Sequence, residues 1–461
     1  MLTYELKKTP GVPLYELLYR CLRQDIQSGV LTPGSKLPSK RALAQHLEIS
    51  KITVEAAYSQ LLAEGYITSR EKVGYFVEES LHPQKPPAAI LRTEEAPIPT
   101  APLDLTANAS GHFPFSVWSK LQREVMLDLG EKLLQHIHPQ GCLELRQAIA
   151  SHLAAFRGMQ VDPANIVIGA GTDFLYNLLI QLLGRDKLYA VEEPGYGKIR
   201  QIYAAGGVEV ISASMDELGV DPRLLSAARV LHISPSHHFP TGIVTPLQRR
   251  QELLRWAEST DSFIIEDDYD SEFRFHAHPM PALCSMDRQG RVIYMNTFSK
   301  SLTPAIRISY MILPEGLMAQ YRQKLGFYSG TVPSFEQYTL ARFLERGYFE
   351  KHINRMRKFY KSRRDKVISS LRSCPWSDRI TIFEKDAGLH FLVQVDTRLD
   401  DAALTALWEK SGIRVRALSS YYHGNAPVSA KRTLVINYSG LDEGELTRLN
   451  ELPPLEKTGA S

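Results

Sequence analysis

The chain has 461 residues, which is enough for two or more domains. Its 44% hydrophobic and 23% charged residues exclude a disordered chain and a collagen-like fibre. Lys+Arg 54 against Asp+Glu 51 leave a net charge of +3, so the charge of the whole chain indicates no polyanionic partner.

Cysteines and apolar runs bear on the cell compartment. The four cysteines are far apart and form no CxxC pair, which argues against a metal site or a disulfide framework. The N-terminal MLTYELKKTP has no apolar core of a signal peptide, and no run reaches the ~18 apolar residues of a membrane helix. We therefore expect a cytoplasmic protein with no membrane partner.

Proline marks a domain boundary. Six of the 27 prolines lie between Leu81 and Pro102, in a stretch without glycine. Such a composition favours extended polyproline geometry and indicates a semi-rigid linker. The predicted organisation is a domain over residues 1–80, a linker over 81–102 and a large domain over 103–461.

The first domain has the pattern of three helices and a hairpin. Apolar residues fall on one helical face from Leu14 to Ile26, and Ser39 can cap a helix over 40–46. Ser50 can cap the next helix, with its inward residues predicted to be Val54, Ala57, Leu61 and Leu62. Two β-rich runs, 66–68 and 75–77, complete the order of a winged helix-turn-helix.

Cations gather in a short part of this domain. Between residues 36 and 53 there are four cations and one acid, Glu48. The segment from Pro13 to Val77, with its PG.KLPS.R.LA and S..TV motifs, closely resembles the GntR-type winged-helix domain of bacterial regulators. That resemblance implies contacts with double-stranded DNA at Ser39, Lys40, Arg41, Ser50, Lys51, Thr53, Lys72 and Gly74. Lys51 stands where arginine is commoner, and lysine lacks the bidentate reading of guanine.

The large domain carries residues suited to one cofactor. A buried-strand pattern over 263–265 ends in Glu266-Asp267-Asp268, and the strand 292–295 is followed by Lys300. Arg307 comes seven residues later. Pyridoxal 5′-phosphate needs an amine for a Schiff base, an acid at its ring nitrogen and donors for its phosphate.

Together with PQG..ELR.AIA.HL, GAGTDFLYNLL, EEPGYGK and SHHFPTG, these residues resemble the fold-type-I pyridoxal phosphate enzymes from about Leu103 to Leu446. The resemblance implies an α/β fold: a mostly parallel sheet between helices, with a smaller α+β C-terminal subdomain. It also implies roles. Lys300 would form the internal aldimine, Asp267 would pair with the pyridine N–H, Tyr269 would bind O3′ and Tyr196 would stack on the ring. The phosphate would be held by Gly171, Thr172, Asp173, Thr297 and Arg307, and no metal is implied.

Three positions depart from the aminotransferases. Phe239 stands where many relatives have an asparagine, and His136 where a partner tyrosine often lies. Val435 occupies the place of the arginine that binds a substrate carboxylate. Four other cations could replace that arginine, and the sequence does not choose among them: Arg432, Arg416, Arg414 and Lys198.

The fusion of the two domains resembles MocR-type regulators, as do EDDYDSEFR and the long basic stretch GYFEKHINRMRKFYKSRRDKV. This resemblance implies a transcription regulator, a head-to-tail homodimer that senses pyridoxal phosphate or its adduct with an amine or amino acid. Two alternatives remain. One is an active aminotransferase with an accessory DNA-binding domain, and the other is a DNA-binding protein whose large domain is only a dimerisation scaffold. The effector, the operator and the sign of regulation stay open.

Overall fold

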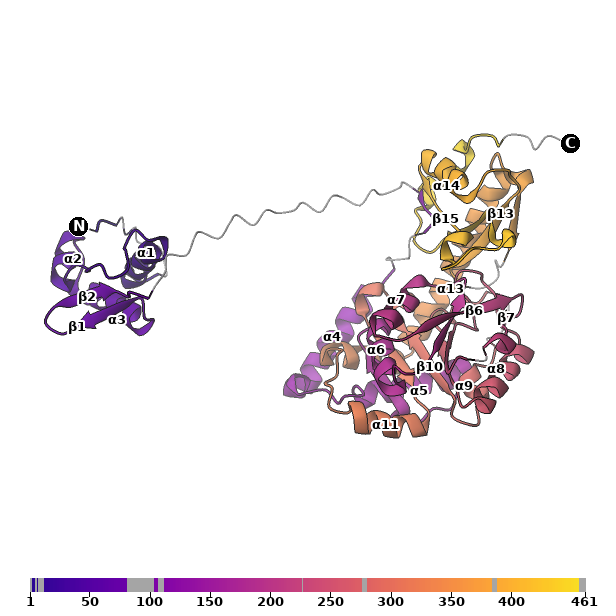
Figure 1. The fold of residues 1–461 in the computed structure, drawn as a ribbon, viewed down its shortest axis with the longest axis horizontal. Helices are drawn as coiled ribbons and strands as arrows, with labels where there is room; N and C mark the ends of the chain where they lie inside the picture. Colours follow the sequence, from indigo (N-terminus) through magenta and orange to yellow (C-terminus); the bar gives the residue numbers. More distant parts are fainter. Residues whose placement is uncertain are drawn as a thin grey trace. The chain divides into compact units, whose positions relative to one another are not determined.

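The computed structural model describes residues 2–4, 6, 12–80, 103–106, 112–225, 227–275, 280–383 and 388–455. The chain divides into two compact units, Met1–Ile98 and Pro99–Ser461 (Figure 1). The expected proline-rich linker, 81–102, lies outside the described residues. None of the described helices is long and apolar enough to cross a bilayer.

The first unit is a winged helix-turn-helix, as expected. Its elements are α1 (Leu14–Ser28), α2 (Lys40–His46), α3 (Lys51–Ala63), β1 (Ile67–Arg70) and β2 (Gly74–Val77). The strands form an antiparallel hairpin that pairs Ile67 with Val77. Both predicted caps are present, since Ser39 Oγ accepts from the Ala42 N–H and Ser50 Oγ accepts from the Thr53 N–H.

One core residue of this unit was predicted wrongly. Leu62 is 42% exposed, whereas Val54, Ala57 and Leu61 are fully buried. Tyr58 takes the fourth inward position of α3, and its hydroxyl donates to the Pro38 carbonyl at 2.9 Å. A tyrosine can bury its ring because its hydroxyl finds a partner. Leu62 lies at the edge of the buried stripe, one residue before the end of α3.

The second unit contains an eight-stranded sheet in the order β4-β11-β10-β9-β8-β5-β6-β7. The strands are β4 (Ile166–Gly169), β5 (Tyr189–Glu193), β6 (Val210–Asp216), β7 (Gly219–Val220), β8 (Val230–Ile233), β9 (Phe263–Asp267), β10 (Val292–Thr297) and β11 (Ser309–Ile312). Among the described strands of this sheet, β7 and β11 run opposite to the others. The mostly parallel sheet agrees with the expected fold class.

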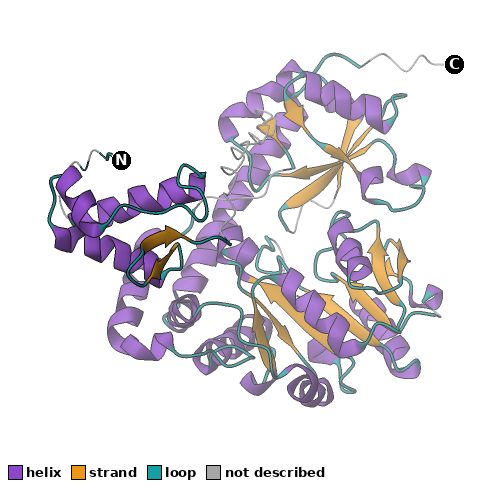
Figure 2. Ribbon diagram, turned by 60° about the vertical axis from the view of Figure 1, so that its left-hand side comes forward, coloured by secondary structure: helices purple, strands orange, loops and turns teal. Residues whose placement is uncertain are grey.

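Helices cover both faces of this sheet (Figure 2). Alternate residues of β4 show why: Ile166 and Ile168 belong to the core beneath α5 (Leu143–Arg157) and α12 (Ser334–Glu345), while Val167 packs in the core of α6 (Thr172–Leu183). The remaining helices of this layer structure are α4 (Phe115–Leu129), α7 (Gly197–Ala205), α8 (Leu247–Ser259), α9 (Leu283–Met286), α10 (Phe298–Ser301) and α11 (Glu315–Leu325). Strands of a sheet covered on both faces are buried along their whole length, as β4, β8 and β11 are.

A smaller α+β subdomain follows the long helix α13 (Tyr348–Ser373). Its antiparallel sheet has the order β12-β13-β16-β15. The elements are β12 (Ile380–Phe383), β13 (His390–Val395), α14 (Asp401–Lys410), β15 (Arg416–Ala417) and β16 (Thr433–Asn437). A parallel pair of β3 (Leu103–Asp104) and β14 (Ile413–Arg414) joins the start of this unit to the subdomain.

Candidate functional site

The topology brings the predicted cofactor residues to one edge of the large sheet. Strands β4, β5, β8, β9 and β10 all run in the same direction, so their carboxyl ends lie along one edge. Gly171, Tyr196, Asp267 and Lys300 each lie at or just after such an end. Arg307 precedes the antiparallel β11, whose amino end meets the same edge. In open α/β sheets this edge is where ligands bind.

Asp267 is the last residue of β9 and is buried. Its Oδ2 accepts a 2.5 Å hydrogen bond from the Tyr176 hydroxyl and lies 3.5 Å from His232 Nε2. Its Oδ1 is buried with no hydrogen-bond partner in the described part of the chain. A buried carboxylate oxygen without a donor is costly. It fits a cofactor whose ring nitrogen carries a proton.

Lys300 lies in the short helix α10, directly after β10. Thr297 caps that helix by accepting from the Ser299 N–H at 3.1 Å, which fixes the turn that holds the lysine. Burial lowers the pKa of the Lys300 amine, and the nearby Asp270 carboxylate opposes that shift. A neutral amine is the form that can attack an aldehyde.

The predicted phosphate cradle centres on Gly171 and Arg307. A Cβ at Gly171 would lie 2.2 Å from an Arg307 guanidinium nitrogen, so only glycine admits this approach. Gly171 also has φ +89°, and Thr172 and Asp173 begin α6 directly after it. Exposed N–H groups at a helix start favour anions. Asp173 is less suited to that role, because its carboxylate pairs with Lys198 at 2.7 Å and Arg307 at 3.4 Å.

Thr297 differs from its expected role. Its hydroxyl is buried and already bonded, since Ser309 Oγ donates to it at 2.8 Å and the Ser299 N–H donates at 3.1 Å. The Ser299 hydroxyl, by contrast, is buried with no hydrogen-bond partner among the described residues. Ser299 is therefore a phosphate candidate that the sequence interpretation missed. Its place beside Lys300 was the available signal.

Two tyrosines were expected to contact the cofactor ring. Tyr196 is 54% exposed and meets the Phe239 ring edge-on at 6.1 Å. The Tyr269 hydroxyl is buried, and it forms no hydrogen bond of normal distance and angle with the described residues. Both therefore keep a surface or a polar atom for a ligand.

Other functional candidates escaped the sequence interpretation. Tyr176 and His232 support Asp267, and the Tyr203 hydroxyl lies 2.7 Å from His232 Nδ1. His237 Nδ1 lies 2.8 Å from Asp270, with both side chains buried. Polar residues inside apolar runs were the signal for Tyr176 and His232, but their partners lie far away in the sequence.

The DNA-binding candidates are spread over α2, α3 and the hairpin. Arg41, Lys51 and Lys72 are exposed, and Lys72 has φ +58° at the tip of the hairpin. Lys40 is instead held by Glu55 at 2.6 Å and lies 5.5 Å from the Tyr75 ring centre. The hydroxyls of Ser39 and Ser50 cap helices. Gly74 has φ +132°, and a Cβ added there would lie 3.2 Å from Lys36 Cε, so the absence of a side chain leaves room for the Lys36 stem.

Comparisons with known proteins agree with this arrangement. Residues 14–77 match the family "Bacterial regulatory proteins, gntR family", and residues 101–451 match "Aminotransferase class I and II". The HTH-type transcriptional regulator YdeL of Bacillus subtilis, described as uncharacterized, is 35% identical over 96% of each chain. The probable rhizopine catabolism regulatory protein MocR of Rhizobium meliloti is 31% identical, over 99% of this chain and 97% of its own. The chain belongs to the MocR-type transcriptional regulators.

The solved structures show the fold of the regulator's large unit. A Pyrococcus horikoshii kynurenine aminotransferase, solved with PMP, KYN and KYA, superposes with a TM-score of 0.66. It is 24% identical and covers 77% of this chain and 91% of its own. The aminotransferase class I and II family depends on pyridoxal phosphate, which is consistent with the residues gathered at the sheet edge.

In this MocR-type chain, the position expected for the carboxylate-binding arginine is apolar. Val435 is 3% exposed and lies in a buried cluster with Leu392, Leu418 and Ala430. Phe239, Tyr421 and Tyr422 pack against that cluster. The other departure, His136, is exposed.

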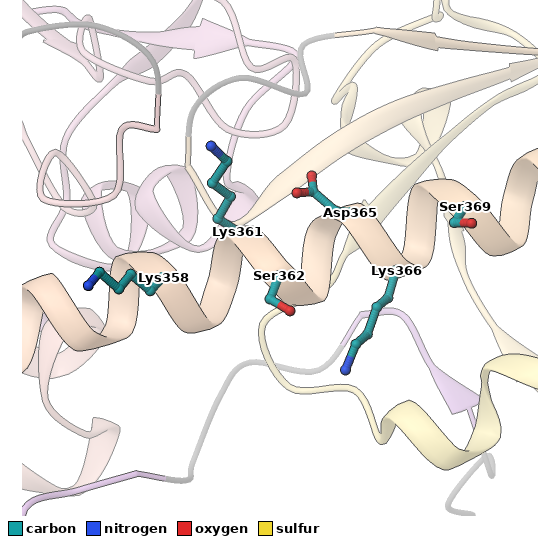
Figure 3. Close-up of a pocket in the computed structure, with 6 residues that line it drawn as sticks. All are labelled: Lys358, Lys361, Ser362, Asp365, Lys366 and Ser369. Atoms are coloured by element: carbon teal, nitrogen blue, oxygen red, sulfur yellow. The ribbon is translucent and has the colours of Figure 1, made fainter.

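The basic stretch of the regulator forms α13, whose apolar face is buried in the core. A shallow surface pocket on its polar side is lined by Lys358, Lys361, Ser362, Asp365, Lys366 and Ser369. Figure 3 shows Lys361 and Asp365 on one side of the helix, with Ser362 and Lys366 on the other. Lys366 is paired with Glu443 at 2.5 Å. These side chains diverge, so they do not converge on one ligand.

Proposed function

We propose that this regulator binds pyridoxal 5′-phosphate in its large unit and changes its DNA binding when an amine or amino acid joins the cofactor. The observation that carries the proposal is the pair formed by Asp267 and Lys300 at one sheet edge. The first has a buried, partnerless carboxylate oxygen and the second a buried amine of lowered pKa. Perturbed groups that converge on such an edge favour a functional site.

Each side chain then has a role toward the cofactor. Asp267 accepts the ring N–H, and Tyr176 holds that carboxylate in place. The Tyr269 hydroxyl binds the phenolic oxygen, and Tyr196 covers a ring face. Gly171, Thr172, Ser299 and Arg307 hold the phosphate. Thr297 acts through the turn of α10, and Asp173 acts by pairing with Lys198 and Arg307.

When bound, pyridoxal phosphate supplies an aldehyde carbon that an amine can attack and an electron-withdrawing ring. The protein's contribution is to bury the Lys300 amine, because burial lowers its pKa and so favours the neutral form. Two histidines near the site, His238 and His390, are buried as well. Burial lowers the pKa of His238 to about 3, and it lowers the pKa of His390 as well.

The small unit reads DNA through the helix-turn-helix and the hairpin. Ser39, Arg41, Ser50, Lys51 and Thr53 would contact the major groove and its phosphates, and Lys40 would join them after exchanging its partner Glu55. Lys72 and Gly74 would carry the hairpin to a neighbouring groove.

A cytoplasmic head-to-tail homodimer completes the proposal. Four large apolar side chains of the second unit are between 73% and 78% exposed: Phe115, Leu127, Leu134 and Phe327. Exposed apolar groups of this size favour a protein interface. We expect twice the chain mass in light scattering, and a Leu127→Asp variant that is monomeric.

The test is spectroscopic and functional. Wild-type protein incubated with cofactor should gain a visible absorption band, which Lys300→Ala should lose. An amine or amino acid that shifts this band should also change DNA affinity in a titration. A colourless wild type would favour the scaffold alternative, and an unchanged DNA affinity would contradict the coupling.

An active aminotransferase is the second candidate, because Lys300 and Asp267 are both present. The apolar surroundings of Val435 favour the regulator instead. Steady conversion of amino acids with 2-oxo acids, abolished in Lys300→Ala, would favour the enzyme.

A further inference from the structure

We propose that Arg416 binds the anionic group of an amine effector, in place of the arginine that Val435 replaces. This inference rests on the proposed cofactor function, and it names the effector class as amines that carry a carboxylate.

The first argument is the register of the small sheet. Strands β15 and β16 are antiparallel, and Arg416 lies directly opposite Val435. Residues directly opposite each other project from the same face, with Cβ atoms about 4.5–5.5 Å apart. Arg416 therefore projects from the same face as Val435, the position where the resemblance places the carboxylate-binding arginine.

The second argument is what surrounds that face. The Phe239 ring meets Tyr196 at 6.1 Å and Tyr421 at 5.2 Å, both edge-on. Phe239 and Tyr421 also pack against the apolar cluster that contains Val435. Arg416 acts on the Tyr421 hydroxyl, lowering its pKa against the larger effect of burial. Arg416 is thus beside the aromatic wall that continues to Tyr196, the residue proposed to cover the cofactor ring.

The third argument is that the other cations named for this role are engaged. Lys198 pairs with Asp173 at 2.7 Å, and Arg414 pairs with Asp104 at 3.2 Å. The Arg432 guanidinium donates to the Thr397 carbonyl at 2.7 Å. Arg416 is exposed and interacts with the neutral Tyr421 hydroxyl, and no acidic side chain in the described ranges forms an ion pair with it within 4.0 Å.

These observations indicate the chemistry of the ligand. A guanidinium offers two parallel N–H donors that match a carboxylate. The rings of Tyr196, Phe239 and Tyr421 can pack against the carbon chain between the amine and that carboxylate. A plain alkylamine would offer Arg416 no anionic partner and would gain nothing from it.

The experiment compares amino acids with their carboxylate-free counterparts. Cofactor-loaded protein is titrated with glycine, L-alanine, β-alanine, 4-aminobutanoate and 5-aminopentanoate, each beside the matching alkylamine. The Kd is taken from the change in visible absorbance and repeated by calorimetry. In the wild type, we expect at least one amino acid to bind roughly 10- to 100-fold tighter than its counterpart.

Variants assign that preference to Arg416. Arg416→Gln should lose it while the Kd of the alkylamine stays the same, and Arg416→Lys should keep part of it. Arg414→Gln is the matched control, two residues away on the neighbouring strand, and should keep the full preference. Because Arg416 is exposed, both Arg416 variants should unfold at the wild-type temperature.

The outcomes separate the two proposals. A wild type that gains no visible band overturns the proposed function and this inference with it. A normal band with no carboxylate preference in the wild type overturns this inference alone. A preference that survives in Arg416→Gln does the same.

Discussion

The Tyr176 hydroxyl donates a 2.5 Å hydrogen bond to Oδ2 of Asp267, while Oδ1 of the same carboxylate is buried without a partner among the described residues. Helix α6 and strand β9 supply these two residues, 91 positions apart. The bond fixes which carboxylate oxygen remains for a ligand, and so it sets the direction in which Asp267 faces the site.

Tyr176→Phe should therefore weaken cofactor binding. The variant removes one hydrogen bond to a charged group, which is worth about 1.5–3 kcal/mol, so Kd should rise roughly 10-fold or more. The cofactor Kd is measured by titration of the visible band. Tyr189→Phe is the control, because this buried tyrosine of the same core donates to the Gly184 carbonyl instead. Equal losses in the two variants would count against a role for the Asp267 contact.

The functional residues at the ends of strands could be predicted from the sequence, whereas their partners far away in the sequence could not. Asp267 and Lys300 each follow an apolar run, so their place at a sheet edge could be predicted. Tyr176 reads as an interruption of an apolar helix, and only the fold brings it to Asp267. The sequence did not reveal that the Thr297 hydroxyl caps α10 while the neighbouring Ser299 hydroxyl stays without a partner among the described residues, because this is a detail of local geometry.

The small unit shows the same limit. Both serine caps follow from local hydrogen bonding and were predicted. The burial of Tyr58 is accompanied by a hydrogen bond to the Pro38 carbonyl, 20 residues away, which helical periodicity alone does not reveal.

Gly171→Ala should damage the phosphate cradle. The new methyl group would lie 2.2 Å from the Arg307 guanidinium at a backbone φ of +89°, so Arg307 must move and the backbone is strained. We expect cofactor affinity to fall at least about 10-fold, with a loss of roughly 1–2 kcal/mol in stability. Gly316→Ala is the control, since no atom lies within 4 Å of its added Cβ. A normal cofactor Kd in Gly171→Ala would show that Arg307 does not need this approach.

Arg41→Ala and Lys51→Ala should weaken DNA binding and leave the cofactor band unchanged. Both side chains are exposed at helix starts, and removing one cation that binds a phosphate should lower the slope of log K against log salt by about 1. The measurement is a salt series of Kd values on a DNA fragment selected from a random pool with the wild-type protein. Arg20→Ala is the control, because Arg20 lies on α1 and pairs with Glu16 at 2.5 Å. An altered cofactor band in Arg41→Ala or Lys51→Ala would contradict two separable functions.

The Glu192→Gln variant should have a higher free energy of unfolding than the wild type, and this difference should grow as pH rises. Burial raises the pKa of Glu192 to about 8, with the Asp267 carboxylate adding to it and the Ser234 N–H opposing it. Folding therefore favours the protonated acid, and this contribution is present below the ordinary pKa of glutamate and is lost as pH rises through 8. Glutamine does not titrate, so the difference in free energy of unfolding should grow between pH 5 and 9, by about 4 kcal/mol. It is measured by denaturant unfolding of cofactor-free protein at several pH values. The exposed Glu258→Gln on α8 is the control and should show no such trend, and a pH-independent difference for Glu192→Gln would mean that Glu192 is ionised in the folded protein.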